Sequence, residues 1–200
     1  MSKASPSADD LAKQIAVAPR APGGRIAVPT AAACGRFDIR IGRDGTWYYQ
    51  GSPIGRIALV KLFATVLKRD EQGDHWLITP AEQGRIEVDD APFVAVELSV
   101  VGSGPDQVIS LRTNLDEIVA VDRDHPLRVE HDAVSGEPAP YVMVRDGLEA
   151  RLSRPVYYEL VELGLERRVG DDHVYGVWSK GGFFALGRLG GPGEAADERA

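Results

Sequence analysis

The chain has 200 residues, of which 44% are hydrophobic and 26% are charged, and its formal net charge is -7. This apolar content is sufficient for one sizeable hydrophobic core or two small ones. The acidic balance argues against a partner that is nucleic acid or a membrane surface, because both require a basic face on the protein.

Signals for metals, disulfides and membrane spans are weak along the chain. Cys34 is the single cysteine, so no internal disulfide forms, and a cytoplasmic location is expected. The four histidines are scattered without metal-ligand spacing, and we expect neither a metal nor a cofactor. No window approaches the roughly 18 apolar residues of a transmembrane helix. The oligomeric state stays open.

The two ends of the chain are expected to lie outside the folded body. Residues 1–36 are rich in Ala, Pro, Ser and Gly, and are predicted to form a flexible arm. Within it, the segment SADDLAKQIA favours a short helix with Ser7 as N-cap and Asp10 completing a capping box. Residues 190–200 are polar and are predicted to be a disordered tail.

Residues 37–92 are predicted to form an N-terminal α+β domain. Apolar and polar residues alternate from Phe37 to Ile41, as in a half-buried strand, and Asp44–Gly45 indicates a tight hairpin. A helix is then predicted from about Gly55 to Arg69. Its apolar stripe consists of Ile57, Val60, Phe63 and Leu67.

Residues 93–189 are predicted to form a C-terminal α+β domain that opens with an antiparallel meander. The segment AVSGEPAP then indicates a second hinge, followed by the strand YVMVR and an Asp146–Gly147 turn. Ser153 stands at the N-cap position of a second helix, and Pro155 lies in its first turn. The order of Asp-Gly hairpin, arginine at the helix start and closing strand thus occurs twice, which predicts a duplicated motif.

One acidic cluster is a candidate for catalysis. Asp89 and Asp90, with Glu87 nearby, are residue types that hold a magnesium ion or act as a general base. The alternative is a solvated bulge where Pro92 interrupts the strand.

A second candidate region runs from Thr113 to Arg128. The short polar side chains of Thr113 and Asn114 either support a turn between strands or give polar specificity to a ligand site. The forked guanidinium of Arg128 suits a carboxylate or a phosphate, or alternatively pairs with Asp122 or Asp124.

The starts of the two predicted helices are the third candidate. Arg56 and Arg154 each stand at such a start, and Arg151 lies just before the second. A basic residue is unfavourable near the positive end of a helix unless an anion or a carboxylate is close, so each arginine either meets a ligand or folds back onto Asp or Glu. The candidate ligand-binding residues are therefore Thr113, Asn114, His125, Arg128, Arg151, Arg154 and the flanking aromatic Tyr157.

Several segments of the chain resemble the bacterial domain-of-unknown-function family 1285. They include CGRFDIRIGRDGTWYYQGSPIGRIALVKLF, IEVDDAPFVAVEL, TNLDEIVAVDRDHPLR and PYVMVRDGLEARLSRPVYYEL. The resemblance implies an α+β fold with duplicated motifs and a C-terminal half superficially similar to pleckstrin-homology domains. It also implies a nucleotide-like ligand between the two halves and a role in signal transduction.

These observations favour a small-ligand binding or sensor protein that recognises an anionic, nucleotide-like molecule at the interface of two related halves. One alternative is a metal-dependent hydrolase that uses Asp89 and Asp90. Another is a protein interaction module that needs no small ligand.

Overall fold

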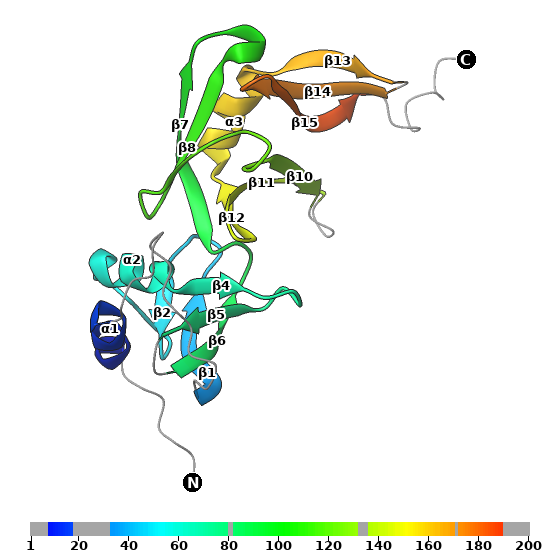
Figure 1. Cartoon of the computed structure of the whole chain (residues 1–200). Helices are drawn as coiled ribbons and strands as arrows, with labels where there is room; N and C mark the ends of the chain where they lie inside the picture. Colours follow the sequence, from blue (N-terminus) through cyan, green and yellow to red (C-terminus); the bar gives the residue numbers. More distant parts are fainter. Residues whose placement is uncertain (1–7, 18–32, 80–81, 132–135, 171, 190–200) are drawn as a thin grey trace. The chain divides into compact units, whose positions relative to one another are not determined.

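The structure, a computed structural model, describes residues 8–17, 33–79, 82–131, 136–170 and 172–189. Strands hold 54% and helices 18% of these residues, so the fold is an α+β arrangement in which strands dominate (Figure 1). The chain divides into two compact units. The first ends at Phe93 and also includes Asp146–Leu148, and the second holds Val94–Arg145 and the residues from Glu149 onward.

The first unit contains two helices and one mixed sheet of six strands. The sheet order is β3-β2-β1-β6-β5-β4, in which β1 and β6 run parallel and all other neighbouring strands are antiparallel. In chain order the elements are α1 (Ala8–Val17), β1 (Ala33–Ile41), β2 (Trp47–Tyr49), β3 (Ser52–Pro53), α2 (Ile57–Thr65), β4 (Leu67–Arg69), β5 (His75–Ile78) and β6 (Glu82–Val88).

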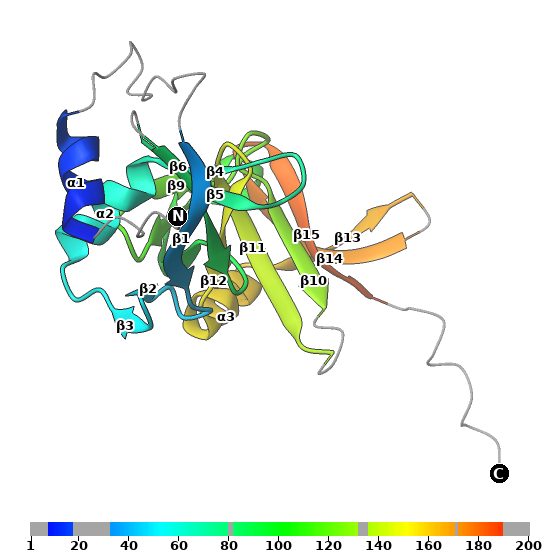
Figure 2. The same ribbon diagram turned by 90° about the horizontal axis from the view of Figure 1, so that it is seen from below.

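The core of the first unit follows from the alternation in β1. Phe37, Ile39 and Ile41 are all buried, as the two-residue period predicts. Phe63 of the helix α2 is fully buried as well, and its ring centre lies 6.3 Å from that of Trp47 on β2. The helix α1 lies alongside α2, as Figure 2 shows. Its Ile15 is buried, so this short helix is packed against the unit by an apolar side chain.

Two boundaries in the first unit differ from the sequence prediction. The helix α2 ends at Thr65 rather than near Arg69, because the next residues form β4 and pair with β5. Ile57, which was placed on the apolar stripe, is 53% exposed. The strand β1 begins at Ala33, within the segment predicted to be an arm, because residues from Ala33 onward pair with β6.

The described part of the second unit contains the α-helix α3 and two sheets. The larger sheet has the order β10-β11-β12-β7-β8-β9, and a smaller sheet has the order β13-β14-β15. The elements are β7 (Phe93–Val101), the short 3-10 helix η1 (Gly104–Asp106), β8 (Val108–Thr113), β9 (Ile118–Ala120), β10 (Leu127–His131), β11 (Pro138–Arg145), β12 (Leu148–Leu152), α3 (Arg154–Glu162), β13 (Leu165–Val169), β14 (Asp172–Ser179) and β15 (Gly182–Leu189).

The helix α3 begins as predicted and packs through Val156 and Leu160, which are both buried. Ser153 occupies the N-cap position, but its side chain makes no capping hydrogen bond. The predicted strand YVMVR is longer than expected, because β11 already begins at Pro138. Ser179 is fully buried, and its hydroxyl donates to the Val121 carbonyl at 2.7 Å.

The two predicted copies share an order of elements but not a pairing. Each has a hairpin with an Asp-Gly turn, then a helix, then three strands that pair antiparallel in sequence. In the first copy the last of these strands, β6, joins the hairpin strand β1. In the second copy the three strands form their own sheet. The duplication, like the similarity to pleckstrin-homology domains, therefore stays a prediction.

Predictions for the chain ends are tested only in part. The short N-terminal helix is confirmed as α1, whereas Ser7 and the tail 190–200 lie outside the described residues. Among the helices that the structure describes, none has the length and apolar character that a membrane crossing requires.

Candidate functional site

The first unit contains a cavity of about 620 Å³. It is lined by side chains of β1, β4, β5 and β6 and by the loops that follow β4 and β6. The lining residues are Arg36, Arg69, Gly73, Asp74, His75, Arg85, Ile86, Glu87, Val88, Asp89 and Asp90. Charged side chains of both signs dominate this wall, so the cavity is suited to a polar ligand rather than to an apolar one.

Strand geometry explains why charges collect here. On β6, Arg85 and Glu87 alternate with buried Ile86, so their side chains share one face of the sheet. Arg36 lies opposite Arg85 in the parallel register between β1 and β6. Two guanidinium groups on facing positions repel each other unless carboxylates or a bound anion compensate them.

Carboxylates in the wall compensate most of the arginines. Asp74 approaches Arg85 to 2.5 Å, and Glu87 pairs with Arg36. The two carboxylates at the end of β6 are held by arginines outside the lining. Asp89 pairs with Arg40 at 2.6 Å and Asp90 pairs with Arg43 at 3.4 Å.

Arg69 differs from the other arginines of the cavity. Its Nε donates to the carbonyl oxygen of Gly73 at 3.4 Å and its Nη1 to that of Gly147 at 3.3 Å, so its partners are neutral carbonyl groups. Within the described part of the chain, no carboxylate forms an ion pair with its guanidinium. Since the other lining arginines already have carboxylate partners, Arg69 supplies positive charge that is not locally compensated. A ligand anion is the natural partner for such a group.

Arg69 also acts on the neighbouring imidazole. The two residues lie opposite each other in the register between β4 and β5. Burial lowers the pKa of His75, and the charge of Arg69 lowers that pKa further, while Asp70 and Asp74 act in the opposite direction. His75 is therefore held neutral at physiological pH, as one hydrogen-bond donor and one acceptor in the cavity wall.

The arginine predicted on β10 is already engaged within the second unit. Arg128 donates to both oxygens of Glu149, at 2.6 and 2.7 Å, and also pairs with Glu130. Its guanidinium lies 4.4 Å from the ring centre of Tyr141 on the next strand. Arg128 therefore forms ion pairs within the second unit, and its predicted contact with a ligand stays a prediction. The partners come from β10 and β12 rather than from the acidic loop at 122–124.

The arginines at the helix starts likewise fold back onto carboxylates. Arg154 pairs with Glu137 at 2.8 Å, and Arg56 at the start of α2 pairs with Asp9 of α1. Arg151 has a partner as well. An anion at Arg128 would have to displace the carboxylates that hold its guanidinium, whereas Arg154 forms a single exposed contact with Glu137.

Thr113 and Asn114 support the connection between β8 and β9. The Thr113 hydroxyl accepts from the backbone N–H groups of Leu115 and Glu117, at 3.3 and 3.1 Å. The amide oxygen of Asn114 accepts from the N–H of Val94 at 3.1 Å. These contacts match the turn-supporting alternative of the sequence analysis.

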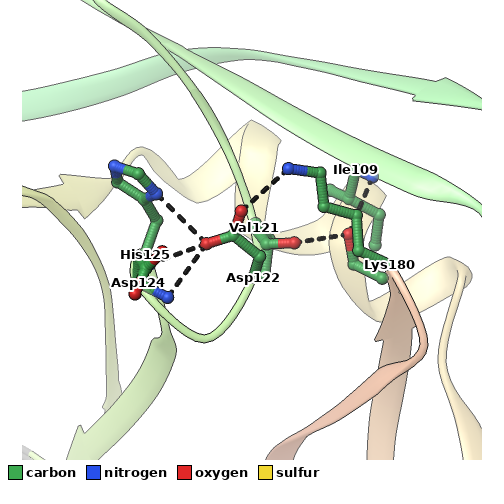
Figure 3. A network of polar contacts seen from close by, with 7 residues as sticks. Ile109, Val121, Asp122, Asp124, His125 and Lys180 are labelled. Carbon is green, nitrogen blue, oxygen red and sulfur yellow. Dashed lines mark hydrogen bonds and ion pairs between the residues drawn. The ribbon is translucent and has the colours of Figure 1, made fainter.

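His125 belongs to a network around Asp122 (Figure 3). Its Nδ1 lies 3.1 Å from Oδ1 of Asp122, and Lys180 donates to Oδ2 at 2.8 Å. The backbone N–H groups of Asp124 and His125 also donate to Asp122. The hydrogen bond from Lys180 is the largest cause that holds the pKa of Asp122 well below its usual range, and the hydrogen bonds from His125 and Asp124 act in the same direction. The network ties two loops of the second unit together.

The remaining candidates are aromatic and acidic. Tyr157 is half-buried beside Tyr158, with ring centres 6.4 Å apart, and burial raises its pKa. Asp89 and Asp90 line the cavity but are ion-paired, and the described residues contain no cluster of three or more metal-ligating side chains. The carboxylates that a hydrolase would use to hold a cation are thus oriented to arginines.

Sequence reasoning missed the basic half of the cavity. Only the acidic end, Asp89 and Asp90, had been selected. The signal available was the alternation of charge in RIEVD, where Arg85, Glu87 and Asp89 share one strand face. Arg69 gave no such signal, because it had been assigned to the end of a helix.

Taken together, the chain is a two-unit α+β protein whose first unit carries a charged cavity. It belongs to the DUF1285 family of proteins of unknown function. Residues 29–91 match the N-terminal domain of this family, and residues 92–186 match its C-terminal domain. The resemblance inferred from the sequence is therefore confirmed.

Solved structures of two relatives match the chain. A DUF1285 family protein from Silicibacter pomeroyi DSS-3 is 40% identical and has a TM-score of 0.78, and the match covers 94% of this chain and 97% of that one. A DUF1285 family protein from Shewanella baltica OS155 is 25% identical and has a TM-score of 0.50, covering 62% of this chain and 91% of that one. No curated protein matches the chain.

Proposed function

We propose that the protein binds a small anionic ligand in the cavity of the first unit, with Arg69 as the principal contact to the anion. The observation that carries the proposal is the guanidinium of Arg69, which lines the cavity and has no ion-paired carboxylate among the described residues. Arg36 and Arg85 stand on the same wall and each retains N–H groups beyond its ion pair.

The dimensions of the cavity suit a nucleotide-like molecule. Its volume of about 620 Å³ lies within the ~300–1,000 Å³ that small-molecule sites typically occupy. Exposed ion pairs such as Arg36–Glu87 contribute about 0–1 kcal/mol, so a ligand phosphate recruits their free N–H groups at little cost. Neutral His75 provides a further donor or acceptor for the ligand.

Binding without catalysis is the function that the side-chain arrangement favours. Asp89 and Asp90 each pair with an arginine through one carboxylate oxygen, and the described residues contain no cluster of three or more metal-ligating side chains that would hold a catalytic cation. We infer a sensor that responds to its ligand, in the cytoplasm and in signal transduction, as the context in which such binding is used.

Isothermal titration calorimetry against inorganic phosphate and a panel of nucleoside mono- and diphosphates tests the proposal. Arg69→Gln removes the charge but keeps a polar side chain that can still form hydrogen bonds. Because a hydrogen bond to a charged group contributes about 1.5–3 kcal/mol, this variant is expected to weaken binding roughly tenfold or more.

Arg154→Gln is the matched variant for the second-unit residues predicted from the sequence, since it also removes one exposed arginine. It is expected to leave the affinity unchanged. Loss of binding in Arg154→Gln with none in Arg69→Gln would assign the ligand to the second unit. Absence of binding to every member of the panel would contradict an anion-binding function.

A further inference from the structure

The strand β13 forms an open edge of the smaller sheet in the second unit. It pairs with β14 on one side, and β15 lies beyond β14 (Figure 1). All five residues of β13, Leu165–Val169, are exposed. Among them are two large apolar side chains, Leu165 at 42% and Val169 at 50% exposure. An edge of this kind offers unpaired backbone donors and acceptors to another strand.

The sequence of β13, LERRV, is self-complementary when it is paired with a copy of itself. In an antiparallel pair, facing residues point to the same side of the sheet. When the two strands are copies related by a two-fold axis, one residue must therefore face its own copy, and the axis passes between these two residues. The register centred on Arg167 is the one that pairs the full strand. It sets Glu166 opposite Arg168 twice, and Leu165 opposite Val169 twice.

The arrangement of Arg167 removes the main objection to this register. Two copies of Arg167 face each other at the axis, and like charges directly opposite destabilise a sheet. In this structure, however, the guanidinium of Arg167 lies over the rings of its own unit, 4.6 Å from the centre of Trp178 and 5.3 Å from that of Phe183. These contacts draw the charge away from the edge.

We propose that β13 is an interaction surface for a second copy of this chain, with the two β13 strands paired antiparallel about Arg167. The two three-stranded sheets then join into one continuous sheet of six strands across the two-fold axis. Charged residues on an edge strand usually prevent it from pairing with a copy of itself. In this register, however, each Glu166 faces an Arg168 of the other copy, so the charges attract, and this complementarity identifies a second copy as the partner. The contact is small, so the dimer is expected to be weak and dependent on protein concentration.

Charge reversal of the full-length protein tests this register. Sedimentation velocity across the micromolar concentration range measures the dimer fraction. Arg168→Glu sets Glu opposite Glu, and Glu166→Arg sets Arg opposite Arg, so each single variant is expected to be monomeric. The double variant with both changes restores opposite charges and is expected to dimerise like the unaltered protein. Arg123→Glu, at an exposed loop position, controls for the change in net charge.

Cysteine cross-linking provides a second readout in a Cys34→Ser background. Facing Cα atoms at the axis lie about 4.5–5.5 Å apart, within disulfide range, so Arg167→Cys is expected to form a covalent dimer under mild oxidation. In Leu165→Cys the two thiols stand about 13 Å apart along the strands and are expected to remain reduced.

Three results would overturn the proposal. These are a monomer at every concentration, a dimer that survives both single charge reversals, and a double variant that is not restored. None of them bears on anion binding by the first unit, so this proposal and the proposed function succeed or fail separately.

Discussion

At the residue scale, the properties of the cavity are concentrated in the pair Arg69 and His75. Burial and the positive charge of Arg69 both lower the pKa of His75, whereas Asp70 and Asp74 oppose this effect. Below the usual histidine pKa of about 6.5, the unfolded state is protonated while the folded state resists protonation. The contribution of His75 to stability is therefore complete above that pH and decreases as the pH falls below it.

The charge of Arg69 is expected to be visible in the titration of His75. In Arg69→Gln the pKa of His75 rises toward its usual value, because one of the two causes that lower it is removed. NMR of the imidazole signals over pH 4–8 (about the range in which histidines titrate) measures this shift. A His75 titration that is identical in the two proteins would show that Arg69 does not act on the cavity wall.

Asp122 is expected to be a stabilising residue of the second unit. Its carboxylate accepts hydrogen bonds from Lys180 and from the backbone N–H groups of Asp124 and His125. Asp122→Asn removes the negative charge and some of these hydrogen bonds, and should lower the free energy of unfolding by about 1–3 kcal/mol. Urea denaturation measures the loss.

Asp124→Asn is the control, since the Asp124 side chain takes no part in the network of Figure 3. The pH dependence has a defined sign. Because the pKa of Asp122 is lowered in the folded state, its contribution is complete above its usual pKa near 3.9 and is lost as the pH falls through the lower folded value. Equal losses in both variants would argue against the network.

At the element scale, local patterns predicted elements well where the partner was close in sequence. The β1–β2 hairpin and the start of α3 followed from Asp-Gly and Ser-x-Pro signals. The end of α2 did not, because Leu67 suits the apolar stripe of a helix as well as a buried strand position. Pairing of β4 with β5 decided between them, and that contact is not encoded in the periodicity.

The candidate site was harder to predict, for the same reason. Arg154 at the start of α3 and Arg128 on β10 both have a carboxylate partner, but these partners, Glu137 and Glu149, lie 17 and 21 residues away along the chain. Whether a guanidinium is compensated depends on these tertiary contacts. The sequence predicts that an arginine can bind an anion, but it does not show whether a carboxylate of the protein already pairs with its guanidinium.

The parallel contact between β1 and β6 leads to a prediction about glycines. Gly35 and Gly84 face each other in the register. A Cβ on Gly84 would lie 2.5 Å from the ring of Phe37, whereas one on Gly35 has nothing within 4 Å. Gly84→Ala should therefore destabilise the protein by about 1–3 kcal/mol, as overpacking typically does. Thermal denaturation measures the difference.

Gly35→Ala is the matched control in the same strand pair and should change the melting temperature little. If both variants behave alike, the close approach of Phe37 to the β6 backbone does not constrain the sheet. Loss in Gly84→Ala alone would confirm that this ring requires a glycine opposite it.

At the scale of the whole molecule, the chain is organised as two units. The domains predicted from sequence met at residues 92 and 93, and division by contacts falls between Phe93 and Val94. The assignment of Asp146–Leu148 to the first unit had no counterpart in the sequence analysis. The Asp146–Gly147 signal predicts a turn at this place, but it does not indicate which unit the turn contacts.

The overall charge and the local charge of the molecule have opposite consequences. The net charge of -7 repels anions at long range, so anion binding must come from short-range contacts at Arg69. Added salt screens the arginine contacts within a Debye length of about 8–10 Å near physiological ionic strength. Affinity for phosphate is therefore expected to decrease as sodium chloride is raised, which calorimetry at several salt concentrations measures. An affinity that is independent of salt would contradict a charged contact.

The most direct test of the central claim is to map a bound anion residue by residue. Backbone amide NMR spectra are recorded while a nucleoside diphosphate is added to the full chain. We predict progressive shifts at Gly73, Asp74 and Ile86 around the cavity of the first unit, with these shifts lost in Arg69→Gln. Shifts confined to the second unit around Arg128 and Arg154, or none at all, would contradict the account.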